Sequence, residues 1–383
     1  LVSDAPLGMT LSGGIDTSAM LAIVDQLGLI HKMNTFSLKM GEKSFDESKY
    51  QQLMVKKTGS IHHEILVTPE KVIENIYNQI SYTDEPSGDG AAIPSFILAK
   101  EASKHVKVLL SGEGGDEVFN AYPTISAYQY RKYYRMAPGI VRNGIKNIIH
   151  SLPANYSKLS FDFKAKRFTA GAELDVPEAH FYWRHVFNDQ DKKELLFNTE
   201  TFPETSRFFR DLYDKVESND INKISYIDMK HFFIDDLMVK NDRTFLANSV
   251  EGRFPFMDRF LVEYATKLPV KYRVKGLNNL RYIQKQAMRD LLPKEILQRQ
   301  GFGLEMPHSI WFLDKLGPFA EKYLNKKTVE RTEILNWEFI EKIWQIHQSG
   351  KADYGRPLWC VLNFLIWFDL FIENDSYKSH WHN

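Results

Sequence analysis

The stretch LGMTLSGGIDTS, residues 7–18, decides the fold that we expect for this chain. A short apolar run, Leu7 to Leu11, leads into Ser12-Gly13-Gly14, and a helical pattern follows. A strand that ends in a glycine turn and then opens a helix presents backbone N–H groups to an anion. The stretch therefore predicts a phosphate site at the carboxyl end of a first strand.

The side chains of this loop suit a nucleotide bound with a divalent ion. Gly13 and Gly14 let the backbone approach phosphate oxygens, and the hydroxyls of Ser12 and Ser18 can donate to those oxygens. Asp16 supplies a carboxylate of the kind that magnesium binds. The sequence has no G-x-x-x-x-G-K-[ST] motif, which disfavours a P-loop kinase or GTPase.

A second segment repeats the pattern. The apolar run Val106 to Leu110 predicts another buried strand, and Ser111-Gly112-Glu113-Gly114-Gly115-Asp116-Glu117 follows it. Ligands of open α/β sheets bind at the carboxyl ends of strands, so we expect both loops to face one crevice. Asp16 and Asp116 are then candidates to share a magnesium ion that bridges ATP phosphates. The alternative is two unrelated turns whose carboxylates are solvated.

Residues 1–120 alternate short strands with helices, which predicts a doubly wound parallel sheet. Further strands are expected at 32–38 and 61–67. One helix is expected to begin with a capping box made by Ser44 and Glu47 and to end at Gly59, and another to begin at Thr68-Pro69-Glu70. Residues 121–383 show helical periodicity rich in aromatic side chains and no strand runs, so we expect a largely helical second half.

Composition narrows the class of protein. The 383 residues include 49 basic and 49 acidic side chains, so we expect neither nucleic acid nor a membrane as a partner. The single cysteine, Cys360, gives no internal disulfide framework and fits the cytoplasm. The longest apolar stretch, Trp359 to Ile372, is shorter than the ~20 residues of a spanning helix and is expected to be a core helix. His62 and His63 lack the spacing of a zinc motif, so a structural role at a strand edge is favoured.

The chain as a whole resembles the C-terminal synthetase domain of the glutamine-hydrolysing asparagine synthetases. The resemblance rests on segments that occur in family order along nearly the whole chain: Ser3 to Gly8 before the first loop, Thr35-Phe36-Ser37, His62-His63-Glu64, Asp84-Glu85-Pro86, Ala92-Ile93-Pro94, the S-G-E-G-G-D-E loop, Asp236-Leu237 through Arg243, and Ser249 through Asp258. It implies an α/β fold of the ATP-pyrophosphatase (adenine nucleotide alpha hydrolase-like) type in residues 1–120, with a helical portion in 121–383 that completes the active site.

The resemblance also implies a reaction. ATP, with Mg²⁺, adenylylates a small-molecule carboxylate, most simply L-aspartate, and ammonia or an amine then attacks the acyl-adenylate. Glu113 would orient the amine or take its proton, and Lys240 would reach the pyrophosphate. The remaining nucleotide contacts would come from one set of residues: Leu11, Ser12, Gly13, Gly14, Asp16, Thr17, Ser18, Leu38, Ser111 and Gly112.

Two lysines typical of the family are missing. Arg281 stands at the position of the first, and Arg299 lies next to a short deletion that removes the second. Loss of a transition-state donor typically costs about 3 to 4 kcal/mol unless another group replaces it. Both arginines are therefore candidate catalytic residues, and a catalytically impaired ATP-binding module is the alternative.

The resemblance leaves the partners open. The chain starts within what resembles a helix before the first loop, so we expect a fragment whose ammonia comes from a glutaminase domain upstream or in another chain. The resemblance is also compatible with a homodimer. Related enzymes that share the scaffold, including β-lactam synthetases and lasso-peptide cyclases, keep a sugar acid, a peptide or an antibiotic precursor open as the carboxylate. A tRNA-modifying pyrophosphatase-type enzyme is disfavoured by the neutral charge.

Overall fold

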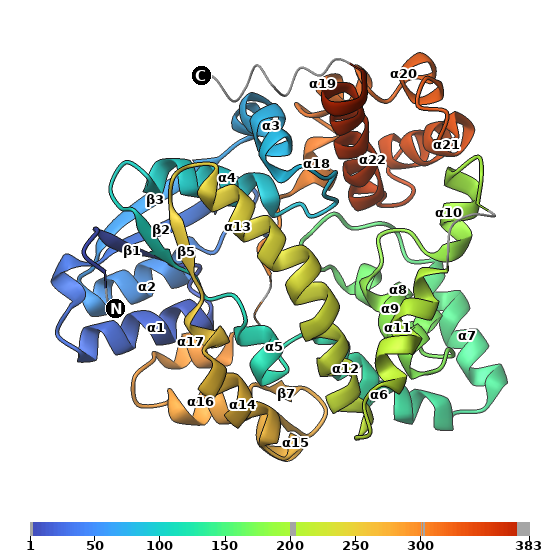
Figure 1. Ribbon diagram of the computed structural model, residues 1–383. Helices are drawn as coiled ribbons and strands as arrows, with labels where there is room; N and C mark the ends of the chain where they lie inside the picture. Colours follow the sequence, from blue (N-terminus) through green and yellow to red (C-terminus); the bar gives the residue numbers. More distant parts are fainter. Residues whose placement is uncertain (1–2, 200–203, 300, 302, 374–383) are drawn as a thin grey trace. The chain divides into compact units, whose positions relative to one another are not determined.

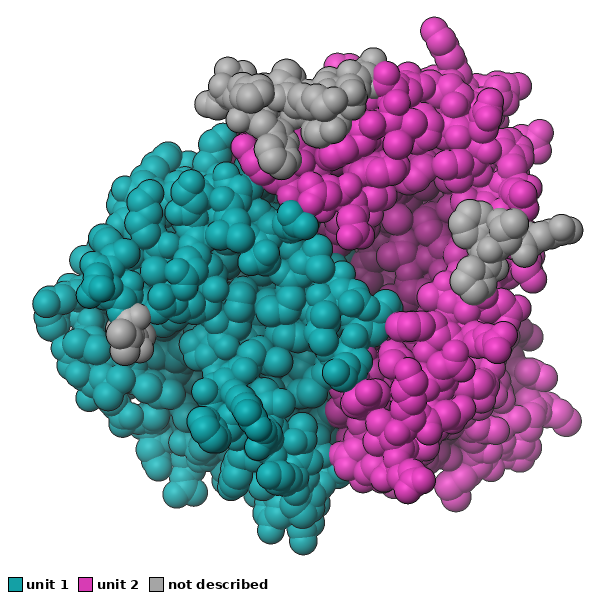
Figure 2. Space-filling model, viewed as in Figure 1, with its two compact units in different colours: residues 1–68, 91–126, 228–306 teal, residues 69–90, 127–227, 307–383 magenta. Residues whose placement is uncertain are grey.

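A computed structural model describes residues 3–199, 204–299, 301 and 303–373. The chain divides into two compact units, each built from three segments of sequence (Figure 2). Unit 1 comprises residues 1–68, 91–126 and 228–306, and unit 2 comprises residues 69–90, 127–227 and 307–383. Each unit contains segments from before and from after residue 120. The expected division into domains 1–120 and 121–383 stays a prediction.

Unit 1 is built on a parallel sheet with strand order β3-β2-β1-β4-β5. The strands are β1 (Leu7–Thr10), β2 (Asn34–Met40), β3 (Ile61–Val67), β4 (Val108–Leu110) and β5 (Glu251–Arg253). The central strand β1 pairs with β2 through Met9 opposite Thr35, and with β4 through Met9 opposite Leu110. The predicted α/β fold with a parallel sheet, followed by a largely helical part, is confirmed.

Helices cover both faces of this sheet, as a doubly wound fold requires (Figure 1). The chain moves from β1 through α1 (Ile15–Gln26) to β2, and through α2 (Ser48–Thr58) to β3, so right-handed crossovers put α1 and α2 on one face. It then returns past β1, and α4 (Ala92–Ala102) and α13 (Val239–Leu246) pack together on the other face. The strand order therefore reverses between β1 and β4, where open α/β sheets bind ligands.

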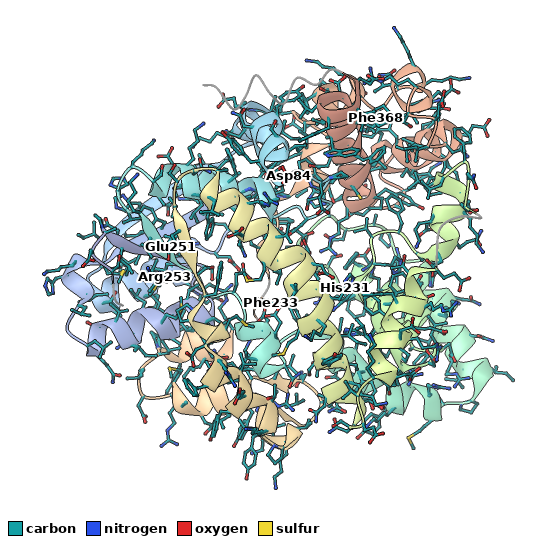
Figure 3. All side chains as sticks on the ribbon, in the orientation of Figure 1. Asp84, His231, Phe233, Glu251, Arg253 and Phe368 are labelled. Atoms are coloured by element: carbon teal, nitrogen blue, oxygen red, sulfur yellow. The ribbon has the colours of Figure 1, made fainter. Side chains whose placement is uncertain are left out.

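The expectation that no strand follows residue 121 is wrong. The strand β5 pairs with β4 through Gly252 opposite Leu109, and its labelled residues Glu251 and Arg253 appear in Figure 3. A Cβ at Gly252 would lie 2.6 Å from Phe245 Cδ2, so this strand needs a glycine to pack under α13. Three residues of the type Glu-Gly-Arg carry no apolar alternation, which explains why the pattern gave no strand signal. A second, antiparallel pair, β6 (Val274–Lys275) with β7 (Asn279–Leu280), also lies in this region.

The remaining elements of unit 1 are short. They are η1 (Ile30–Lys32), α5 (Gly115–Phe119), the π-helical η2 (Asp228–Met238), η3 (Pro255–Met257), α14 (Arg259–Lys267), α15 (Val270–Arg273), α16 (Tyr282–Ala287) and α17 (Lys294–Gln298). A hydrophobic cluster joins α1 to α17: Met20 and Leu21 lie in it together with Leu292 and Ile296. This packing holds the last segment of unit 1 against the helix that follows the first loop.

The described residues of unit 2 form helices joined by loops, with no named strand. Its helices are α3 (Pro69–Thr83), α7 (Gly139–His150), α8 (Phe161–Gly171), α9 (Val176–Arg184), α10 (Asp189–Leu195), α11 (Thr205–Asp214), α12 (Asp220–Ile227), α18 (His308–Trp311), α19 (Gly317–Glu321), α20 (Lys326–Glu330), α21 (Trp337–Gln348), α22 (Gly355–Phe368) and the π-helical η4 (Asp369–Glu373), together with most of α6 (Pro123–Met136). One isolated bridge joins Leu196 to Leu335.

The apolar C-terminal helix is longer than its sequence indicated. α22 continues into η4, and the helical run Gly355–Glu373 reaches 19 residues, a length and composition that would allow a membrane span. Half of its most apolar window is buried inside the structure, as in the core helix of many proteins, so this is weak support for a span. Burial raises the pKa of the Cys360 thiol in this helix to about 11.

Helix ends follow the sequence in part. Gly59 ends α2 with a left-handed φ of 71°, as predicted, and α3 begins at Pro69 with Glu70 in its first turn. The expected Ser44–Glu47 capping box is wrong, because α2 begins at Ser48 and the Asp46 carboxylate accepts from the Ser48 N–H at 2.9 Å.

Candidate active site

The first loop, residues 11–14, is closed by its own hydroxyls. The Thr17 hydroxyl accepts from the Ser12 N–H at 3.2 Å and lies 3.2 Å from the Ser12 hydroxyl. The Ser12 hydroxyl in turn accepts from the Gly14 N–H at 3.1 Å. A threonine at position 17 therefore organises the loop as a serine hydroxyl would, and its methyl group packs beside the second loop.

Gly13 is required by the fold at this point. Its φ of +69° is left-handed, and a Cβ there would lie 2.7 Å from Tyr50 Cβ and 2.8 Å from the Gln51 nitrogen. The loop thus runs directly against α2. Any side chain at this position would push the loop away from the helix.

The second loop, residues 111–114, lies against the first. A Cβ on Gly112 would lie 2.8 Å from Thr17 Cγ2, and a Cβ on Gly115 would lie 2.3 Å from Asp16 Oδ1. Gly114 has a φ of +92° and faces Met257. The buried Ser111 donates its backbone N–H to the Arg253 carbonyl at 2.8 Å, which ties the loop to β5. The structure therefore brings the two predicted loops together at the point where the strand order reverses.

The two acidic side chains meet on one guanidinium. Arg281 Nη1 donates to Asp16 Oδ2, and Arg281 Nη2 forms an ion pair with Asp116 Oδ1. Gln284 Nε2 donates to the other Asp16 oxygen at 2.7 Å. Arg281 holds this position with a left-handed φ of 57° at the N-cap of α16. The side chains of Arg281, Asp16 and Asp116 are 12%, 15% and 31% exposed, so the bridge is largely withdrawn from water.

Arg299 contacts the first loop beside α2. Its guanidinium lies over the Tyr50 ring, 4.3 Å from the centroid, and pairs with the Glu47 carboxylate. Nη1 lies 3.5 Å from the Ser12 carbonyl oxygen. Both arginines predicted from the missing lysines thus contact the loops, one at the acidic pair and one at the loop backbone.

A buried carboxyl lies beside Glu113 in this unit. Glu117 accepts a hydrogen bond from the Tyr122 hydroxyl. The Glu117 pKa is raised to about 7, chiefly by burial; the Tyr122 hydrogen bond lowers it, and the charges of Glu113 and Asp228 add to the rise. The carboxyl of Glu117 is therefore partly protonated near neutral pH, and it is close enough to Glu113 for their charges to interact.

Two predicted nucleotide contacts, Leu11 and Leu38, already bond within the protein. The Leu11 N–H donates to the Phe36 carbonyl at 2.8 Å, and its carbonyl accepts from the Ser37 hydroxyl. The Leu38 carbonyl accepts from Gln51 Nε2 at 3.0 Å. A carbonyl keeps a second lone pair, so these groups can still accept from a ligand. The Ser18 hydroxyl is fully buried, with no hydrogen-bond partner in the described part of the chain, and its role at a phosphate stays a prediction.

Lys240 lies on α13 and is buried in unit 1. A buried ammonium group needs compensating charge, since burial without a partner is costly. The role of Lys240 at a pyrophosphate stays a prediction.

The two carboxylates suit a magnesium ion in their chemistry. Magnesium is commonly held by one or two protein carboxylates, with phosphate oxygens and water filling its other positions. Among the described residues, no group of three or more His, Cys, Asp or Glu could hold a metal alone, so phosphate would have to contribute. Asp16 and Asp116 fit that division of ligands, with Arg281 as the competing cation.

Sequence reasoning missed several residues of the site. Glu47 and Tyr50 hold Arg299, and Gln284 orients Asp16. Lys285 follows Arg281 by one helical turn, and burial together with the Arg281 charge lowers the pKa of its ammonium group. The spacing 281–284–285 on one short helix is the signal that could have indicated Gln284 and Lys285.

Comparison with known proteins gives one consistent family. The sequence profile described as asparagine synthase matches residues 1–369. The chain is 26% identical over 375 residues to "Asparagine synthetase [glutamine-hydrolyzing] 1" of Bacillus subtilis, which covers 97% of this chain and 57% of that protein. It is 30% identical over 226 residues to "Putative asparagine synthetase [glutamine-hydrolyzing] 2" of Methanocaldococcus jannaschii, covering 51% of this chain and 43% of that protein.

A relative with another name also matches. "Amidase chry2" of Gibberella zeae is 22% identical over 375 residues, with 88% of this chain and 54% of that protein covered. The chain thus spans little more than half the length of the curated relatives that it matches most fully.

Proposed function

The chain belongs to the asparagine synthase family, and from this premise we propose that unit 1 carries the site of an ATP-dependent, amide-forming ligase. The observation that carries the proposal is the meeting of the two glycine loops where the strand order reverses, with Asp16 and Asp116 on one guanidinium. Such a place suits a nucleoside triphosphate: backbone N–H groups for phosphate, carboxylates for its divalent ion, and cations for the charge that develops on transfer.

In the proposed reaction a carboxylate oxygen of the substrate attacks the α-phosphorus, and pyrophosphate leaves. The nitrogen of ammonia or an amine then attacks the acyl carbon, AMP leaves, and Glu113 accepts the proton that nitrogen loses. Ser12, Gly13, Gly14 and the N-terminus of α1 bind phosphate in this scheme. Lys240 binds the pyrophosphate.

Asp16 and Asp116 would hold Mg²⁺ together with the phosphates. When bound, the ion would neutralise phosphate charge and so assist displacement at phosphorus. Arg281 would then turn from the carboxylates toward the phosphates, where its fixed charge replaces that of the missing lysine. Arg299, held by Glu47 and Tyr50, would fix the loop backbone at Ser12.

L-Aspartate is the proposed carboxylate, because the relatives with the highest coverage are named asparagine synthetases. The amidase-named relative keeps a different carboxylate open. Ammonia would come from a glutaminase domain, upstream or in another chain, since those relatives are named glutamine-hydrolyzing.

ATP–pyrophosphate exchange tests the proposal, because it reports adenylylation alone. We expect exchange that requires Mg²⁺ and L-aspartate, and the appearance of asparagine and AMP when ammonium is added. Asp16→Asn should abolish exchange, whereas Asp25→Asn, near the other end of α1, should leave it within about twofold. Exchange with another carboxylate but not with aspartate would support an adenylylating ligase and contradict aspartate as its substrate.

A second candidate is an ATP-binding module without turnover. It is favoured by the Arg281 bridge, which already pairs with both carboxylates. Measurable ATP binding without exchange for any acid would support it. If loss of the family's loop lysine is the only cause, Gln300→Lys, at a position outside the described residues, should then produce ATP–pyrophosphate exchange.

A further inference from the structure

The helix α7 has the most exposed apolar face in unit 2. None of its residues is buried, and Ile140 and Ile148 are 89% and 68% exposed. The helix lies outside α8 and α9 in Figure 1, and its main packing partner is α8. An exposed apolar surface of this kind usually marks an interaction site.

The arrangement of residues around α7 is amphipathic. At 100° per residue, Ile140, Val141, Gly144, Ile145 and Ile148 fall on one arc, and the polar residues fall on the opposite arc. Only Arg142 and Ile149, at one border between the arcs, are half-buried. The helix thus packs through an edge and leaves most of its apolar arc exposed.

The end of α6 extends this surface. Tyr133 and Met136 are exposed, Met136 by 80%, and a surface hollow of about 340 Å³ is lined by Tyr130, Tyr133, Tyr134 and Phe168. Tyrosine is enriched where a protein meets the boundary between a bilayer and water. We call α7 together with residues 130–136 the α6–α7 surface.

The segment 127–161 is cationic in a chain that is neutral overall, with Asp220 facing Lys132 and Glu173 facing Arg142 from neighbouring segments. Residues 127–161 contain six cationic side chains and no Asp or Glu: Arg131, Lys132, Arg135, Arg142, Lys146 and Lys158. Arg131 is buried and donates to the Ala172 carbonyl at 3.1 Å, and Arg142 pairs with Glu173 at 3.0 Å. Lys132 and Arg135, at the end of α6, and Lys146, on the polar arc of α7, are exposed.

We propose that the α6–α7 surface binds an anionic phospholipid bilayer, with α7 lying in the plane of the interface. Apolar side chains on one arc and cations on the polar arc are what such helices use to bind a negatively charged membrane surface. Charge complementarity selects this occupant over a second copy of the chain. A symmetric dimer would place the cationic surface against itself.

Vesicle flotation tests the proposal with the full chain. We expect binding to phosphatidylcholine vesicles that contain about 30% phosphatidylglycerol, weaker binding at 0.5 M NaCl, and no binding to phosphatidylcholine alone. Ile140→Asn with Ile148→Asn should weaken binding by about tenfold or more. Lys132→Glu with Lys146→Glu should weaken it by at least about fivefold per charge.

Matched controls come from unit 1. Leu27→Asn with Phe260→Asn removes two comparably exposed apolar side chains, and Lys56→Glu with Lys57→Glu makes the same charge change. Both control pairs should bind vesicles as the unaltered chain does. Circular dichroism and the melting temperature would confirm that every variant is folded.

Three results would overturn the proposal. The first is no binding to the anionic vesicles. The second is equal weakening by the α6–α7 variants and by their controls. The third is a dimer in light scattering that Ile140→Asn with Ile148→Asn dissociates, since the apolar arc would then face a second copy.

Discussion

Removal of the Arg281 side chain should destabilise the protein, and it should also increase the rise in melting temperature that Mg²⁺ causes. The guanidinium is largely buried and pairs with both Asp16 and Asp116. Breaking a buried pair typically costs about 3 to 5 kcal/mol, and the partial exposure of Asp116 lowers the expected cost of Arg281→Ala to about 2 to 3 kcal/mol.

The expected shift in melting temperature follows from the size of the chain. An unfolding entropy of about 2.1 cal/mol/K per residue over 383 residues gives about 0.8 kcal/mol/K, so each kcal/mol moves the melting temperature by about 1.2 °C. Arg281→Ala should therefore melt about 2.5 to 3.5 °C lower in EDTA. Arg259→Ala, which removes an 84% exposed side chain paired with Glu263, should shift it by less than about 1 °C.

Magnesium supplies the second half of the test. An ion at about 100 times its Kd stabilises by about 2.7 kcal/mol, or about 3 °C here. In the unaltered chain Arg281 competes for the same carboxylates, so its shift with Mg²⁺ should be smaller than that of Arg281→Ala. The reasoning is refuted if Arg281→Ala melts like Arg259→Ala in EDTA, or if Mg²⁺ raises both melting temperatures equally.

Three further predictions concern the same unit. The Glu117 pKa lies near 7 in the folded chain, above the ordinary 4.5, so its contribution to stability is full below pH 4.5 and is lost as the pH rises through 7. Relative to the unaltered chain, Glu117→Gln should therefore gain up to about 3 kcal/mol of stability between pH 5 and pH 8. A difference in melting temperature between the two proteins that does not change with pH would contradict this. Gly13→Ala and Gly28→Ala both place a side chain at a φ near +70°, but only at Gly13 would the added Cβ lie within 3 Å of other atoms. In urea unfolding, Gly28→Ala should therefore cost about 1 kcal/mol of stability and Gly13→Ala clearly more, and Gly13→Ala should also lose ATP binding by calorimetry. Equal costs for the two variants would show that α2 moves to make room for the side chain. Arg299→Ala should weaken ATP binding by about tenfold or more. Arg299→Lys should recover little of this loss, because a lysine cannot both stack on Tyr50 and pair with Glu47 as the planar guanidinium does. Full recovery of ATP binding with lysine would mean that only the charge matters.

The local parts of the fold were predictable from the sequence. The runs that became β1, β3 and β4 and the loops after β1 and β4 are short-range patterns, and Gly59 and Pro69 act within their own helical turn. The family resemblance placed Arg281 and Arg299 as candidates because their neighbours in sequence matched.

The rest depends on partners that are distant in sequence. Arg281 meets Asp16 across 265 positions, and its left-handed backbone at the start of α16 has no glycine or asparagine to indicate it. Glu47 looked like a capping residue, yet its carboxylate pairs with Arg299 across 252 positions. β5 is defined by its pairing with β4 and not by its own composition. Periodicity reports only on neighbours, so it could not find these contacts.

The order of the sheet has a consequence for how the protein is made. The loops at residues 11–14 and 111–114 emerge from the ribosome long before β5, Arg281 and Arg299, which all lie beyond residue 250. Until then β4 is an uncovered edge strand made entirely of buried apolar residues, the kind of edge that pairs with other chains. A nascent chain that ends near residue 250 should therefore need chaperones to avoid aggregation, and its nucleotide loops should bind ATP only after the last segment of unit 1 has been added.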